Sequence, residues 1–77
     1  MITKAVTLTS TPTAITAIAG LKESNIQIWS NQVLEFQSPG DDLVVLSPNT
    51  VLPLPDTGAL NTLLFKGAGT LYIVIHD

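Results

Sequence analysis

The chain has 77 residues, a formal net charge of −3 and no cysteine. It holds only three Lys and Arg residues in total, so the clustered positive charge that binds nucleic acid phosphates is missing. Without cysteine it can form neither a disulfide framework nor a thiolate metal site. The length predicts a single β domain over residues 1–77, with about 60% of its unfolded surface buried on folding.

The sequence also predicts no contact with a membrane. No stretch approaches the roughly 18 consecutive apolar residues that a membrane-spanning helix requires. Near the start, the segment from residue 7 to residue 16 is rich in Thr, where a signal peptide has an apolar middle region. We therefore expect a protein that is made in the cytoplasm.

Turn-forming residues recur at short intervals along the chain, from Pro12 to Gly69. Between them apolar and polar residues alternate, and no window sustains the apolar spacing of a helix. Such spacing is typical of a compact antiparallel β-sandwich or small barrel, so we predict an all-β fold of about 7–8 short strands. The expected strands are Ile2–Thr9, Thr13–Ala19, Asn25–Trp29, Val33–Gln37, Leu43–Leu46, Val51–Leu54, Thr62–Lys66 and Thr70–His76.

Period-two patterns assign faces to the early strands. Val6 and Leu8 share one face of the first strand, and Thr residues occupy the other, which indicates a half-buried strand. Ile26 and Ile28 repeat the pattern, with Trp29 on the opposite face. Trp29 therefore has two open interpretations, an anchor for a partner or a core residue of the sandwich.

The connections predict several turns. Residues 30–32 are expected to form a tight turn, because Asn31 tolerates a positive φ. Residues 66–70, with two Gly, are the strongest candidate for a β-hairpin. Pro12 indicates an edge strand or a bulge. The segment from Pro48 to Pro55 contains three Pro residues and is expected to be stiff and partly extended.

Three apolar runs interrupt the alternation, at Leu43–Leu46, Leu63–Phe65 and Leu71–Ile75. Continuous apolar strands are typical where both faces are buried, and a two-layer fold buries only one face of each sheet. We expect another chain to cover some outer faces; the alternative is a loop or terminus of the same chain. The interface candidates are Val6, Leu8, Trp29, Val51, Leu52, Leu54 and Tyr72.

Residues with catalytic or metal-binding chemistry are scarce. The single His is His76, next to the last residue, where a catalytic geometry is hard to hold. Asp41 and Asp42 are interpreted as part of a polar turn, because a hard cation needs roughly six to eight oxygen ligands. Gly67-Ala68-Gly69 lacks the following helix of a phosphate loop. We therefore expect no enzyme activity, no cofactor and no metal.

Several segments resemble small virion proteins of tailed bacteriophages, in particular capsid decoration (cement) proteins. The likeness lies in Thr9–Ile15, Asn25–Asn31, Leu46–Leu54 and Gly69–Val74. It implies a structural virion protein on the outer surface of an icosahedral capsid, where it braces the junctions between capsomers. The implied partners are the major capsid protein and further copies of the chain, as a homo-dimer or homo-trimer at a symmetry axis.

Two alternatives remain open at this point. A neck or tail-tip component of the same virion would share the composition but bind a ring of subunits. A small carbohydrate-binding module would instead use Trp29 and Tyr72 as a platform on which a sugar stacks.

Overall fold

The computed structural model describes residues 2–15 and 24–76, which form two four-stranded antiparallel sheets and one short helix. The predicted all-β fold is confirmed. The first sheet has the strand order β1-β8-β3-β6 and the second has the order β2-β7-β4-β5. The elements are β1 (Ile2–Thr7), β2 (Thr13–Ala14), β3 (Ser24–Trp29), β4 (Leu34–Gln37), β5 (Val44–Leu46), β6 (Leu52–Asp56), α1 (Thr57–Thr62), β7 (Leu64–Gly67) and β8 (Thr70–Ile75).

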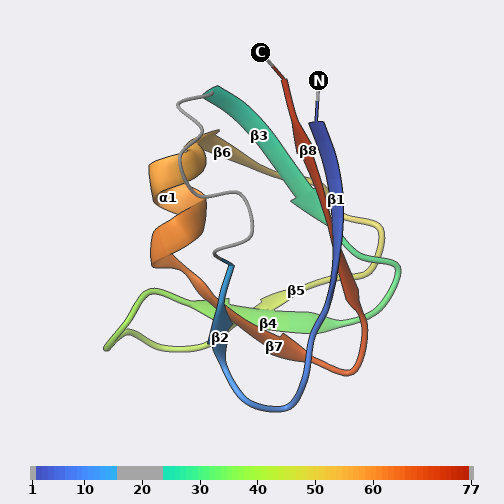
Figure 1. Ribbon diagram of the computed structural model, residues 1–77. Helices are drawn as coiled ribbons and strands as arrows, with labels where there is room; N and C mark the ends of the chain where they lie inside the picture. The colour runs from blue at the N-terminus through green and yellow to red at the C-terminus, as the bar shows by residue number, and fades with distance from the viewer. Residues whose placement is uncertain (1, 16–23, 77) are drawn as a thin grey trace.

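The two sheets cross rather than run alongside each other. In Figure 1, β4, β5 and β7 run across the direction of β1, β3 and β8, which is the orthogonal kind of sheet packing. The chain passes repeatedly from one sheet to the other, because β1, β3 and β6 belong to the first sheet and β2, β4 and β7 to the second. β1 and β8 pair along their whole length, from Ile2 opposite Ile75 to Thr7 opposite Thr70.

The core lies between the sheets and consists of aliphatic side chains and one aromatic ring. The first sheet supplies most of the core. Its inward-facing residues lie opposite one another on paired strands, such as Ile26 opposite Ile75 and Ile28 opposite Ile73. The second sheet contributes Leu34 and the fully buried Phe65. The predicted alternation is confirmed. The buried cluster is Leu8, Ile15, Ile26, Ile28, Leu34, Leu46, Leu60, Phe65, Leu71, Ile73 and Ile75.

Helix α1 contradicts the expectation that no segment is helical. It spans only six residues, too few for an apolar periodicity to be visible in the sequence. Short helices depend on tertiary packing for most of their stability, and Leu60 supplies it here with a fully buried side chain. The strand predicted to begin at Thr62 consequently begins at Leu64. Of the strand predicted over Thr13–Ala19, residues 16–19 lie outside the described part of the chain.

The segment from Lys66 to Thr70 is a corner between the sheets, so its prediction as a hairpin is wrong. It joins β7 of the second sheet to β8 of the first, and these strands do not pair with each other. Gly67 has a φ of 152°, and a Cβ placed there would lie 2.7 Å from Leu34 Cδ2. The chain leaving β1 follows the same corner, because the Gly67 amide donates to the Thr9 carbonyl at 2.9 Å.

A second corner lies between β3 and β4, where a tight turn was predicted. Ser30 is fully buried, and its Oγ accepts a hydrogen bond of 3.1 Å from the Gln32 amide. Its carbonyl accepts a 2.7 Å bond from the Asn49 amide, which ties this corner to the turn that follows β5. Two other Asn residues, Asn25 and Asn49, adopt a positive φ.

The proline-containing strands lie at sheet edges. β6, which contains Pro53 and Pro55, is an edge strand of the first sheet. An edge strand tolerates proline because it has a neighbouring strand on one side only, so the missing N–H need not break a hydrogen bond of the sheet. Pro12 directly precedes β2, an edge strand of the second sheet, as the sequence indicated. The predicted extended segment from Pro48 to Pro55 therefore ends within a regular strand.

Candidate functional site

The outward side of the first sheet carries no charged residue on the four strands described. Residues of the opposite parity face the core, because Ile26, Ile28 and Ile73 are buried. Alanine, valine, proline, threonine and glutamine surround two aromatic rings on this side. We call this surface the aromatic face, and it consists of Thr3, Ala5, Thr7, Gln27, Trp29, Pro53, Pro55, Thr70, Tyr72 and Val74.

Trp29 and Tyr72 form the centre of the aromatic face. They lie opposite each other on the paired strands β3 and β8, and their ring centroids are 4.6 Å apart with an interplanar angle of 29°. Such a stacked pair contributes about 0.5–1.5 kcal/mol beyond its buried area. Both rings are half-buried, so each also presents surface to solvent. The structure therefore excludes the interpretation of Trp29 as a core residue of the sandwich.

A hollow of about 300 Å³ adjoins the aromatic pair. Ala5 lies opposite Tyr72 on the neighbouring strand β1, and its small side chain leaves space beside the ring. Thr3, which adds a hydroxyl, and Lys4 also line the hollow. The hollow therefore combines two aromatic rings with a hydroxyl group and one Lys, and it suits contact and stacking better than acid–base chemistry.

The predicted interface residues separate into two groups. Trp29 and Tyr72 lie together on the aromatic face. Val51 is 51% exposed and directly precedes β6, whose first residue Leu52 pairs with Ile28, so Val51 lies at the same end of the sheet as Trp29.

The remaining candidates point inward. Leu8, which was expected to contact a partner, is buried in the core and offers little side-chain surface. Val6, Leu52 and Leu54 are half-buried and pack against the core cluster, which occupies the surface they were expected to offer. The reason is parity, because each shares its face of the strand with the buried isoleucines of its neighbours.

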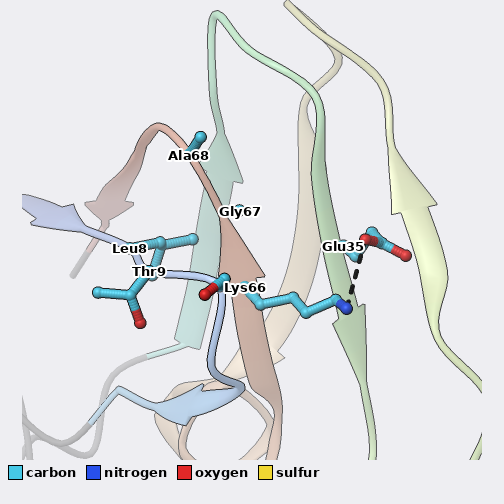
Figure 2. A pocket seen from close by; sticks show the side chains of 7 residues that line it. Leu8, Thr9, Glu35, Lys66, Gly67 and Ala68 are labelled. Carbon is cyan, nitrogen blue, oxygen red and sulfur yellow. Dashed lines mark ion pairs between the residues drawn. The ribbon is translucent and has the colours of Figure 1, made fainter.

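A larger hollow of about 380 Å³ lies at the corner between β7 and β8 (Figure 2). Lys66 and Glu35, cross-strand neighbours on β7 and β4, form an ion pair there with Nζ and Oε1 3.8 Å apart. Their side chains are 28% and 41% exposed, and an exposed pair of this kind contributes about 0–1 kcal/mol. The two charges compensate each other, and the other lining residues, among them Leu8, Thr9, Gly67 and Ala68, offer no titratable group. Volume alone therefore does not make this hollow the functional site.

The residues considered for catalysis or metal binding lie apart. His76 follows β8, where its amide donates to the Asn25 carbonyl at 3.2 Å. Asp41 and Asp42 are exposed in the β4–β5 turn, as predicted, and the Asp41 amide bonds to the Ser38 carbonyl at 2.9 Å. Within residues 2–15 and 24–76, no three His, Cys, Asp or Glu residues come together to hold a metal ion.

Comparisons with known proteins do not assign the chain to a family. No protein-family model, curated protein or solved structure matches the chain. No helix in the described part of the chain is long and apolar enough to cross a membrane. The candidate site therefore rests on the geometry of the aromatic face.

Proposed function

We propose that the protein is a non-enzymatic structural protein that binds another protein through the aromatic face. The observation that carries this proposal is the stacked pair of Trp29 and Tyr72 at the centre of an uncharged sheet surface. The central part of a protein interface is depleted in charged residues and enriched in aromatic ones. Trp and Tyr are also the residues whose truncation most often costs binding energy.

The rigidity of the aromatic face supports the same function. Trp29 and Tyr72 stand on the two central strands of the first sheet, β3 and β8, each of which pairs on both sides. Stacking restricts both rings before any partner arrives. A surface ordered in advance loses less conformational entropy on binding, so more of its contact energy is available as affinity.

The partner that we propose is the major capsid protein of a tailed bacteriophage. The resemblance of four sequence segments to capsid decoration proteins supports this choice. In that role the protein is made in the host cytoplasm and binds the outside of the icosahedral capsid as a homo-dimer or homo-trimer. Binding to the assembled lattice alone stabilises that lattice by mass action. A location at the neck or tail tip is the alternative within the same virion.

A reconstitution experiment tests the capsid proposal. Purified protein added to capsids that lack it should raise the temperature at which the particles release their DNA. Trp29→Ala should lose most of this effect, because it removes the larger ring of the pair. Val33→Ala serves as the matched control, since Val33 is 57% exposed and lies outside the aromatic face. Binding without a change in the release temperature, or equal losses in both variants, would contradict the proposal.

The hollow beside Tyr72 supports a second candidate function, the binding of a neutral sugar. Ala5 leaves the ring accessible, and Thr3 supplies a hydroxyl nearby. Ala5→Leu separates the two functions, because it fills the hollow while adding apolar surface. Loss of glycan-array binding with capsid binding retained would favour the sugar, and the opposite result would favour the protein interface.

A further inference from the structure

Three of the four sheet edges are protected against pairing with another chain. β1 carries Lys4 within its span, and β6 carries Pro53 and Pro55, which have no N–H to donate. β2 is only two residues long and follows Pro12. Charged residues, prolines and very short strands are the usual means by which proteins prevent edge-to-edge association. The fourth edge, β5, is also short, with three residues, but it contains neither a charge nor a proline.

β5 is also the place where apolar side chains are least covered. Val44 and Val45 are neighbours in the strand and point to opposite faces, yet they are 52% and 59% exposed. Leu43, directly before the strand, is 40% exposed. Val44 and Val45 therefore leave both faces of the strand uncovered at its start, whereas Leu46 at its end is buried in the core.

The other two apolar runs are sheltered within the described part of the chain. β8 alternates between buried and half-buried residues, and Phe65 of β7 is fully buried. Of the three runs expected to need cover, only the one at Leu43–Leu46 keeps exposed side chains in the described residues, at Leu43, Val44 and Val45.

We propose that the free edge of β5 binds an extended segment of a partner protein by strand addition. The segment that fits is apolar on alternate residues and carries a Lys or Arg at its C-terminal end. Backbone hydrogen bonds provide the adhesion in this mode of recognition, and alternate side chains provide the specificity. The incoming strand becomes the fifth strand of the second sheet, next to β5.

The position of the basic residue follows from the strand directions and the charges. Every strand pair in both sheets is antiparallel, and an antiparallel addition brings the C-terminal end of the segment beside the start of β5. Asp41 and Asp42 lie there, both exposed and neither in an ion pair among the described residues. Gln37 Nε2 holds the Asp41 carbonyl at 3.2 Å, which helps to fix the turn.

Charge also distinguishes this partner from a second copy of the chain. If two β5 strands paired antiparallel about Val45, Asp41 and Asp42 of one copy would lie opposite Asn49 and Pro48 of the other. That arrangement offers no cation to the carboxylates, and Pro48 offers no N–H. A separate protein that carries a basic residue can both pair with the backbone of β5 and place a cation beside the carboxylates of Asp41 and Asp42.

Peptide titration followed by NMR tests the proposal. The probe is a capped peptide of alternating Val and Thr that ends in Lys, and the comparison peptide ends in Glu. We expect amide shifts confined to residues 41–47, and binding of the Glu peptide at least about fivefold weaker. Shifts at β1 or β6, no shifts at all, or equal binding of the two peptides would overturn the proposal.

Variants locate the contact. Val45→Lys should abolish binding of the Lys peptide, because it places a charge on the free edge. Val51→Lys is the matched control, with 51% exposure against 59% for Val45 and a position outside the second sheet. Asp41→Asn combined with Asp42→Asn should remove the preference for the Lys peptide. Unchanged binding by Val45→Lys, or a preference that survives the double variant, would contradict the assignment.

This surface is independent of the aromatic face, because it belongs to the other sheet. Trp29→Ala should therefore bind the Lys peptide with unchanged affinity, even where it fails to bind capsids. Sedimentation of the free protein distinguishes a separate partner from a second copy of the chain. A dimer that disappears in Val45→Lys would show that a second copy occupies the β5 edge, and it would refute the proposed partner.

Discussion

Gly40 and Gly67 both adopt a positive φ, but they differ in what surrounds them. Gly40, with a φ of 85°, follows Pro39 in the turn closed by the bond from Asp41 to Ser38, the arrangement of a type II turn. A Cβ at Gly40 would meet no atom within 4 Å. At Gly67 a Cβ would press on the buried side chain of Leu34. The two positions therefore separate backbone strain from crowding of the core.

Gly67→Ala is expected to destabilise the protein more than Gly40→Ala. The substitution at Gly40 costs about 1–2 kcal/mol of unfolding free energy through strain alone. At Gly67 the displacement of Leu34 adds roughly 1–3 kcal/mol, because overpacking forces side chains out of their preferred rotamers. Urea denaturation of both variants measures the difference, and equal midpoints would show that Leu34 adjusts without cost.

Some residues of the candidate site could be recognised from the sequence, whereas the position of others depended on the pairing of the strands. Trp29 could be singled out from the sequence because it is the only Trp, and its parity opposite Ile26 and Ile28 indicated an outward face. Leu8 and Leu54 are as apolar as any interface residue, yet the same parity rule places them at the core. Composition suggested these leucines as contacts, and only the pairing of the strands shows that they face the core.

At the scale of elements, the edge strands differ in how they avoid association. β1 pairs with β8 on one side and has no strand partner on the other within the described residues. Its only charge is Lys4, which alternates with the outward residues Thr3 and Ala5. A single Lys on an edge strand disfavours pairing, because a neighbouring strand would have to desolvate it.

Lys4→Val should consequently increase self-association. The variant replaces the charge on β1 with a residue that favours strands, and it leaves an edge of six residues exposed. Light scattering across a concentration series should show a larger mean mass than for the unmodified protein. Lys66→Gln is the control, because it removes a charge from β7, a strand that pairs on both sides. The same increase in both variants would attribute the effect to net charge.

At the scale of the whole molecule, one core joins the two sheets. Leu34 and Phe65 of the second sheet belong to the same buried cluster as Ile28 and Ile73 of the first. The cluster also includes Leu60 of α1, so the helix shares the core of the sheets. Neither sheet retains a complete core without the other.

The two sheets are therefore expected to unfold together. Fluorescence of Trp29, on the first sheet, and far-ultraviolet circular dichroism of all the strands should give superimposable urea transitions. Refolding should take milliseconds to seconds, because most strand pairs join segments far apart in the sequence, as β1 and β8 do. A fluorescence change that precedes the loss of strand signal would show that the first sheet opens independently.

The sequence by itself determined the positions of most strands, their inward faces and the scarcity of catalytic side chains. These features depend on local patterns, such as the alternation from Ile26 to Trp29, and period-two alternation is visible in a single segment. The strand boundaries also follow breakers such as Pro48 and Gly69, which act on their own backbone.

The tertiary structure alone decided which strands pair, and with that the corner at residues 66–70, the helix α1 and the exposure of β5. Two strands separated by a short Gly-rich loop look alike whether they join one sheet or two, because the pairing partners lie elsewhere in the chain. Covering of an apolar run likewise depends on distant segments. Val45 and Phe65 are both apolar strand residues, and only the packing of the sheets exposes one and buries the other.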